Sequence, residues 1–211
     1  MSYKIDVINV EWKKVSEKEL SKTIFNDENV NKSLIHEFVV MQLANARQNL
    51  AHVKTRWEVV SSWKKLFRQK WTWRARAWDA ASPIRRSGWQ TFWPRNNRNY
   101  SKDMNKKARK KALFWSLSLK LKSWDILALE SYTSDEISTK FANTVINNIK
   151  LSDEKVLLVV SRWDDVVIKS FRNLPNVNYV YYDYLNPKDL LTHNKVLFLL
   201  SSLESFEDLN S

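Results

Sequence analysis

The residues of this chain that are best suited to chemistry are cations, and they gather in one segment. From Arg47 to Lys111 there are 19 Lys and Arg against three acids, a local net charge of +16, whereas the remaining residues carry −4. A packed domain cannot bury so many cations, because each would lose its hydration without gaining a partner. The segment is therefore expected to lie in solvent or against a polyanion.

The pattern within this segment favours nucleic acid as the polyanion. Arg74 and Arg76 flank Ala75 in its densest part, and a planar guanidinium can engage phosphate or a base edge with two donors. Turn residues interrupt the charges, which indicates a shaped backbone among RNA helices. A diffuse, solvated polycation is the alternative interpretation. The residues expected to bind RNA are Arg47, Lys54, Arg56, Lys64, Lys65, Arg68, Gln69, Lys70, Arg74, Arg76, Arg85, Arg86, Arg95, Arg98, Lys102, Lys106, Lys107, Arg109 and Lys110.

Residues that could support catalysis or metal binding do not form a recognisable set. The chain has no Cys, and His36, His52 and His193 lack metal-ligand spacing. Asp164 and Asp165 are adjacent, so on a helix they would point apart and are better explained as charges near a helix N-terminus. Neither a dinucleotide-binding nor a phosphate-binding Gly motif is present. We predict a protein that is not an enzyme and has no catalytic residue, metal site or cofactor.

Composition sets the broad class of the protein. The chain has 211 residues, 44% of them hydrophobic, a net charge of +12 and an isoelectric point of about 9.8. This length is enough for one domain with a sizeable core, or for one domain with an extension. The N-terminal sequence lacks the apolar stretch of a signal peptide, and no apolar run approaches the roughly 18 residues that would span a bilayer. The expected location is the cytoplasm, away from membranes.

Periodicity predicts two helices on either side of a long irregular segment. Apolar residues at helical spacing predict a helix over 31–47, and a second helix begins near Asn105 with Ala108, Ala112, Trp115 and Leu119 on one side. Between them, residues 48–100 show no periodicity and exceed the roughly 12 to 15 residues of an ordinary connection. We therefore predict a globular domain of residues 1–47 and 101–211, with 48–100 inserted as an extended basic RNA-binding loop.

The remainder of the chain predicts an α/β fold. Compact apolar runs predict strands, with helices between them, and this alternation favours a mostly parallel sheet covered by helices on both faces. Ser134 is expected to cap a helix that buries Phe141, Val145 and Ile149, and a second helix is expected over 164–172. The N-terminal residues are expected to add an edge strand or a hairpin. The predicted strands are 125–130, 155–160, 177–182 and 195–200.

The balance of Trp and Gly is abnormal. There are eleven Trp and one Gly, whereas average usage would give about 15 Gly. The sequence RQKWTWRARAW at 68–78 becomes RQKGTGRARAG if Trp71, Trp73 and Trp78 are replaced by Gly. In that form it resembles the signature loop of the bacterial type of the fourth large-subunit ribosomal protein family.

The resemblance to this family extends over nearly the whole chain. TRWEV at 55–59 is similar to the family's TRGEV, and the two turns within 82–95 are similar to its SP..RGGG and FGP turns once Trp89 and Trp93 are Gly. Segments 29–48, 100–113 and 172–177 resemble, in the same order, its first long helix, the helix after the loop and a late turn. The chain departs from the family at Ser61, Ser62 and Ser87, near Gly-rich positions, and at Leu66 and Phe67, where Pro-Trp is expected.

The resemblance implies a structural role in the large ribosomal subunit. It implies early binding to large-subunit ribosomal RNA, contact with several RNA domains, and a basic loop that lines part of the nascent-peptide exit tunnel. Neighbouring ribosomal proteins are further implied partners. Some members also bind their own messenger RNA, and the sequence does not decide whether this chain does.

Two explanations of the Trp residues lead to different chemistry. In the first, the gene encodes Gly with UGA codons that were translated as Trp; in the second, genuine Trp side chains stack on unpaired bases, which contributes about 1 to 3 kcal/mol each. We favour the first, because Gly adopts positive φ freely whereas Trp is strained there. Trp12 and Trp124 also precede strand-like runs, where a turn Gly is expected. Genuine Trp would favour a rival function, a cationic protein that binds membrane surfaces or nonspecific nucleic acid.

Overall fold

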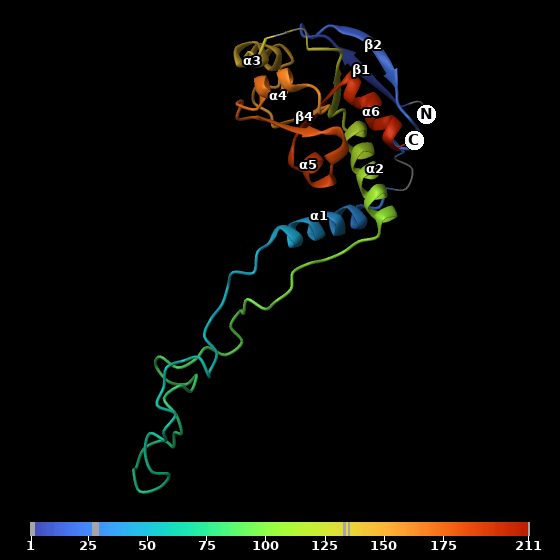
Figure 1. Cartoon of the computed structure of the whole chain (residues 1–211). Helices are drawn as coiled ribbons and strands as arrows, with labels where there is room; N and C mark the ends of the chain where they lie inside the picture. Colours follow the sequence, from blue (N-terminus) through green and yellow to red (C-terminus); the bar gives the residue numbers. More distant parts are fainter. Residues whose placement is uncertain (1–2, 27–29, 133, 135, 211) are drawn as a thin grey trace. The chain divides into compact units, whose positions relative to one another are not determined.

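The computed structural model describes residues 3–26, 30–132, 134 and 136–210. Contacts divide the chain into two compact units, which we call the globular unit, Met1–Gln42 with Asp103–Ser211, and the loop unit, Leu43–Lys102 (Figure 1). The sequence prediction set the loop at 48–100, whereas the contacts assign the last residues of the first helix to the loop unit as well.

A six-stranded sheet forms the centre of the globular unit. Its order is β2-β1-β3-β6-β4-β5, and every neighbouring pair is parallel except β1 and β2. The α/β prediction with a mostly parallel sheet is confirmed, and the N-terminal residues form a hairpin in which only β2 lies at the edge. The strands are β1 Lys4–Ile8, β2 Lys14–Glu19, β3 Ile126–Leu129, β4 Val156–Val160, β5 Val177–Tyr181 and β6 Lys195–Leu199.

Both faces of the sheet are buried at its central strands, as their apolar sequences require. Along β4, Leu157 and Val159 belong to one hydrophobic cluster, whereas Val156, Leu158 and Val160 belong to the other. Successive side chains of a strand point to opposite faces, so a strand that is apolar throughout must be covered on both sides. The four predicted strands are confirmed in place, each ending one residue earlier than expected or starting one residue later.

Helices cover each face of this sheet. Helices α3 and α4 pack on the face that includes Val156, and α2, α5 and α6 contribute to the cluster on the opposite face. The sequence analysis expected a helix between the last two strands, where α5 lies, without giving its range, and it did not predict α6. The helices that follow β3 are α3 Thr139–Asn148, α4 Asp165–Phe171, the 3-10 turn η1 Tyr182–Tyr184, α5 Pro187–Thr192 and α6 Leu200–Asn210.

The predicted cap of α3 is wrong by four residues. Ser138 caps this helix, because its hydroxyl accepts a hydrogen bond from the backbone N–H of Phe141 at 3.3 Å. The Ser134 hydroxyl instead donates to the carbonyl of Glu136 at 2.8 Å. Two serines precede the same apolar pattern, and tertiary packing decides between them.

The two long helices flank the loop in sequence. Helix α1 is Lys32–Ala46 and α2 is Lys106–Lys122, both close to the predicted ranges. Within the globular unit, Phe38 and Met41 of α1 form a small buried cluster with Ala112 of α2. The predicted apolar side of α2 is only partly right, because Leu117 is fully buried against the sheet and lies on a different side from Ala112. Helix α2 packs in two directions, which a single amphipathic stripe does not describe.

Two turns of the globular unit place Trp where the backbone is left-handed. Trp12 has a φ of 63° and closes the β1–β2 hairpin, where a three-residue loop commonly ends in a Gly bulge. Trp124 has a φ of 57° and follows the C-cap of α2. There the N–H of Trp124 donates to Leu121 and that of Asp125 to Lys120, the two hydrogen bonds of a Schellman motif. Gly is the usual residue at both kinds of position.

Candidate RNA interface

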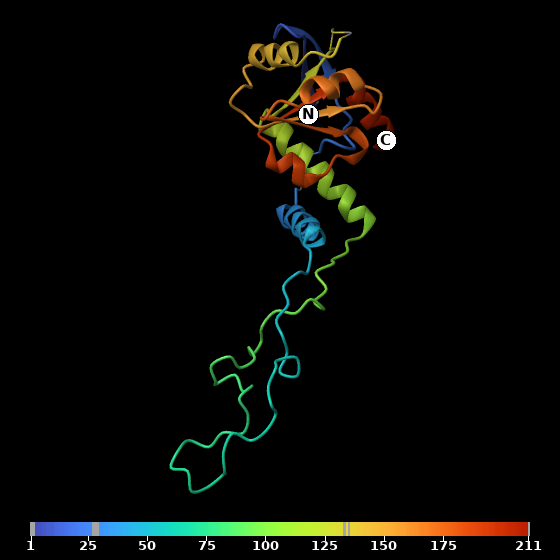
Figure 2. The same cartoon turned by 60° about the vertical axis from the view of Figure 1, so that its left-hand side comes forward.

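The loop unit consists of two arms that run beside each other. From Arg47 to Asn105 the backbone forms turns and bends without helix or strand (Figure 2). Hydrogen bonds nevertheless join the arms at intervals, so the path of the backbone is defined. Asn45 pairs with the backbone of Lys102 through both its side-chain atoms, and other contacts join Asn49 to Arg98, Ser61 to Asp79 and Leu66 to Trp78.

Two guanidinium groups contact one aromatic ring at the base of the loop. The Arg47 and Arg98 guanidinium carbons lie 4.3 and 4.9 Å from the centre of the Tyr100 ring. Each contact is a cation–π interaction, worth about 0.5 to 1 kcal/mol at an exposed site. The side-chain amide of Asn49 donates to the carbonyl of Arg98 at 2.7 Å in the same region. These contacts hold the two arms together where they leave the helices.

Farther along the loop, a buried carboxylate joins the arms. Asp79 is only 2% exposed, and its Oδ1 accepts a hydrogen bond from the Ser61 hydroxyl at 2.9 Å. Burial by itself would raise the pKa of Asp79, but hydrogen bonds from the backbone N–H of Ala81, from Ser61 and from the backbone N–H of Ala80 hold that pKa below its usual value. The carboxylate therefore stays charged. Its hydrogen bond with Ser61 joins the two arms on either side of the loop tip, which we define as residues 62–78.

The single Gly of the chain has a steric reason. A Cβ on Gly88 would lie 2.0 Å from the carbonyl oxygen of Ser82, so no other residue fits without movement of the backbone. The surrounding turn is closed by hydrogen bonds from Gly88 N–H to Arg85 and from Trp89 N–H to Ala81. This segment is the first of the two turns within 82–95 noted in the sequence. The close approach of its backbone to itself explains why Gly stands at position 88.

The predicted RNA-binding residues are nearly all at the surface. Every one of them is exposed except Lys65, which is half-buried. Lys65 donates to the Gln69 side chain at 2.7 Å and lies 5.0 Å from the centre of the Trp78 ring. The structure places the predicted set on two units: the residues from Arg47 to Lys102 on the loop unit and the last four on the N-terminal half of α2 in the globular unit.

The Trp side chains of the loop are exposed except that of Trp89, which is half-buried, and several occupy left-handed backbone positions. Trp63, Trp71 and Trp73 have φ values of 54°, 67° and 51°. Trp73 is 97% exposed, and none of the eleven Trp of the chain is buried. Trp side chains in folded proteins are highly buried on average, so this distribution is unusual for genuine Trp. Trp57 and Trp63 stack on each other with ring centres 5.2 Å apart.

The described part of the chain shows no metal site and no membrane-spanning helix. Among those residues no group of three or more His, Asp or Glu could hold a metal ion, and no helix is long and apolar enough to cross a membrane. His193 is buried, with Nδ1 beside the carbonyl of Asp189 and Nε2 beside the Asn178 amide, so its hydrogen bonds are structural. The sequence analysis missed Asn45, Asn49 and Asp79 as cross-arm ties, because such partners are distant in sequence.

Comparison with known proteins gives matches along nearly the whole chain. The sequence profile described as "Ribosomal protein L4/L1 family" matches residues 18–209. The chain is 37% identical over 205 residues to a protein named large ribosomal subunit protein uL4 from Alkaliphilus metalliredigens, and the match covers 97% of this chain and 98% of that protein. Proteins of the same name from Symbiobacterium thermophilum and Finegoldia magna are 37% and 36% identical, with the same coverage.

These matches cover almost the whole chain and span both units, so the resemblance inferred from the loop motifs is confirmed at the level of the family. The chain belongs to the ribosomal protein L4/L1 family, and as such it is a structural component of the large subunit of the cytoplasmic ribosome and not an enzyme.

Proposed function

We propose that this chain binds large-subunit ribosomal RNA through residues 48–100 and the N-terminal half of α2. In this proposal the globular unit lies on the exterior of the subunit, and the loop passes inward between several RNA domains during early assembly. The tip of the loop lines part of the nascent-peptide exit tunnel. The observation that carries the proposal is the net charge of +16 between Arg47 and Lys111. Within this exposed segment, specific hydrogen bonds join the two arms of the loop.

The cross-arm contacts favour a shaped RNA-binding loop over a diffuse polycation. A flexible cationic tail needs no internal hydrogen bonds, because it binds by charge alone. Here Asn45, Asn49 and Asp79 each join residues more than 15 positions apart. Arginines held on such a framework present planar donors at defined places, which is what recognition of folded RNA requires.

Removal of the loop tests the RNA-binding proposal. Deleting Leu50–Asn97 and joining Asn49 to Arg98 by a short Gly-Ser linker removes 11 Lys and Arg but keeps the contacts at the base of the loop. We expect a folded protein that has lost most of its affinity for large-subunit ribosomal RNA. The slope of log affinity against log salt should also become shallower, because it reports the number of phosphates neutralised. Affinity and slope can be measured by filter binding at several salt concentrations.

A scrambled loop of the same composition is the matched control. It keeps the charge and loses the order of the turn residues, so the proposal expects weak, nonspecific binding. Full affinity of the scrambled chain would indicate a diffuse polycation, and full affinity of the deletion would place RNA binding on the globular unit. Competition by the leader of its own messenger RNA tests that second RNA partner, and anionic vesicles test the membrane-surface alternative.

We also propose that Trp at the turn positions are Gly in the native protein, encoded by UGA. The positions are Trp12, Trp57, Trp63, Trp71, Trp73, Trp78, Trp89, Trp93 and Trp124. Five of them have positive φ, where an L side chain is strained and Gly is not. Trp12 and Trp124 support the proposal independently of the loop, since a hairpin bulge and a Schellman C′ position each favour Gly. Positive φ alone does not demand Gly, because Lys150 in the globular unit and Ser87 and Phe92 in the loop also have positive φ.

The codons and the mass of the native protein test this second proposal. We expect UGA at the nine positions and, in protein purified from its own cells, the mass deficit of nine Trp-to-Gly differences. Restoring Gly in a recombinant chain should raise its melting temperature, because each strained position is relieved. UGG codons with an unaltered mass would contradict the proposal, and the exposed indoles would then be candidates for stacking on unpaired bases.

A further inference from the structure

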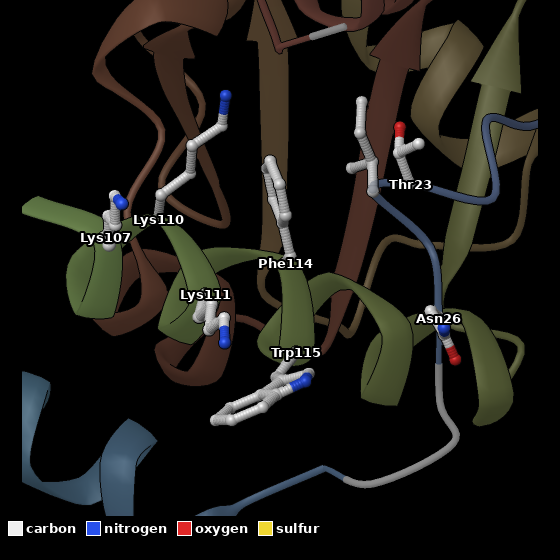
Figure 3. A pocket seen from close by; sticks show the side chains of 8 residues that line it. Thr23, Asn26, Lys107, Lys110, Lys111, Phe114 and Trp115 are labelled. Atoms are coloured by element: carbon white, nitrogen blue, oxygen red, sulfur yellow. The ribbon is translucent and has the colours of Figure 1, made fainter.

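The globular unit contains a cavity that neither the loop nor the sheet explains. Its volume is about 480 Å³, within the range of about 300 to 1,000 Å³ that is typical of small-molecule sites. One wall is the segment after β2, with Thr23, Ile24 and Asn26, and the other is a face of α2 (Figure 3). All the residues that line it belong to the globular unit, so the cavity does not depend on the position of the loop.

The face of α2 that lines this cavity is strongly basic. Lys107, Lys110 and Lys111 lie there on successive turns, and among the residues that the structure describes no acidic residue lines the cavity. Lys107 and Lys111 are exposed and form no ion pair with another residue of the described chain. Lys110 donates to the carbonyl of Asn210 at 3.3 Å, a weak contact for an ammonium group. Within the described ranges, these three cations thus have no acidic partner in the cavity.

An aromatic ring lies beside one of these ammonium groups, that of Lys110. Phe114 is half-buried, and Figure 3 shows it between Lys110 and the segment that carries Thr23. The Lys110 ammonium lies 5.4 Å from the centre of its ring. Trp115 lines the cavity below Phe114, but it is one of the eleven Trp, so the inference rests on Phe114. Flat apolar surface next to several cations suits a ligand that has both an aromatic part and an anionic part.

We propose that this cavity binds an unpaired nucleotide of large-subunit ribosomal RNA. Lysines 107, 110 and 111 contact its phosphates, and its base lies against Phe114, with Thr23 and Asn26 as polar neighbours. An acidic peptide would use the lysines but has no need of the aromatic ring, so RNA accounts for more of the lining. This inference rests on the proposed function, since it assumes ribosomal RNA as the partner. It adds a contact that reads an extruded base on the globular unit, separate from the loop.

Three variants of the full-length chain test the cavity. Phe114→Leu keeps the apolar contact with the core but loses the flat ring, and Lys107→Gln with Lys111→Gln removes two cations. Lys140→Gln with Lys169→Gln is the matched control, because both lysines are exposed on other helices of the same unit. Each variant is titrated against large-subunit ribosomal RNA over a range of salt concentrations, with circular dichroism to verify folding.

The expected results differ for the ring and for the cations. Phe114→Leu should weaken binding roughly tenfold with an unchanged salt slope, because stacking involves no counterion release. The lysine pair should reduce the slope by about 1.4, at about 0.7 for each phosphate of a single strand. The control pair should change neither. Ultraviolet crosslinking followed by mass spectrometry should attach a nucleotide to peptide 107–115 in the unsubstituted chain, and Phe114→Leu should reduce that product.

Two outcomes would overturn the inference and one would overturn its premise. A chain that binds ribosomal RNA with no crosslink in 107–115, and with Phe114→Leu as tight as the unsubstituted protein, has no nucleotide in this cavity. A carbodiimide crosslink from these lysines to a carboxylate of a neighbouring ribosomal protein in assembled subunits, in place of RNA, would assign the cavity to an acidic peptide. A full-length chain without affinity for ribosomal RNA would instead refute the proposed function itself.

Discussion

At the scale of single residues, the Arg and Lys side chains of the loop differ in exposure and in contacts. Arg74 and Arg76 are exposed, and within the described chain neither forms an ion pair, so both guanidinium groups can face RNA. Lys65, by contrast, is engaged by Gln69 and lies over Trp78. A planar fork can bind phosphate or a base edge through two donors, whereas an ammonium group acts as a compact charge. The two residue types are therefore not interchangeable at positions that contact RNA directly.

We accordingly expect Arg74→Lys with Arg76→Lys to reduce assembly although the net charge is unchanged. In chains with Gly at the turn positions, the yield of complete large subunits on a sucrose gradient should fall severalfold. Lys64→Arg with Lys70→Arg serves as the control, because both lysines are exposed and the charge is again constant. This pair should leave the yield nearly unaltered. Equal yields from the two pairs would mean that the loop acts through charge alone.

At the scale of elements, the order of the loop depends on Asp79. Asp79→Asn removes a negative charge from a basic segment, which by electrostatics alone would strengthen RNA binding. We expect weaker binding and faster protease cleavage within 62–78, because the buried, charged acceptor of the Ser61 hydroxyl is replaced by a neutral one. Asp103→Asn is the control, since that side chain is 91% exposed and changes the charge equally. Tighter binding by Asp79→Asn would contradict a positioning role.

The same carboxylate gives the loop a pH dependence. The folded pKa of Asp79 is held below its ordinary value, so its contribution to loop order is fully present above the unfolded pKa of about 3.9. That contribution is lost as the pH falls through the folded pKa. Protease protection of 62–78 should therefore be constant near neutral pH and decline only in acid. A loss of protection between pH 6 and 8 would point to another group.

The packing of helix α2 leads to a third prediction at this scale. Leu117 is fully buried against the sheet, and Leu209 on α6 is 61% exposed. Leu117→Ala should lower the free energy of unfolding by about 2 to 5 kcal/mol, the range for deletion of a buried Leu side chain. Leu209→Ala should change it by less than about 0.5 kcal/mol. Urea denaturation of the two variants measures both values, and similar values would mean that α2 does not pack on the sheet as described.

At the scale of the whole molecule, folding and RNA binding are assigned to different parts of the chain. The apolar strands and their helices bury two hydrophobic clusters in the globular unit, whereas the cations stand on the loop unit and on one face of α2. This separation allows a stable core to form without burying charge. The family relation extends over both units, so the basic loop is part of the same family framework as the sheet.

Much of this arrangement follows from the sequence by local physical chemistry. The compact apolar runs that form β3 to β6 predict strands buried on both faces, and the alternation with helices predicts a parallel sheet. The abrupt loss of periodicity after α1, together with 19 cations in one segment, predicts a solvated loop that faces a polyanion. The excess of Trp over Gly and the order of the turns indicate the resemblance to the family. These features depend on composition and on neighbours in sequence.

Other features required the tertiary structure. Whether Ser134 or Ser138 caps α3, and whether α2 packs in one direction or two, depends on segments that are distant in sequence. The joining of Ser61 to Asp79, and the meeting of Thr23 with Lys107 around a cavity, are contacts between residues whose separation carries no local signal. Such contacts form only when the chain has folded, because the energy that selects them comes from packing and not from the propensity of any one segment.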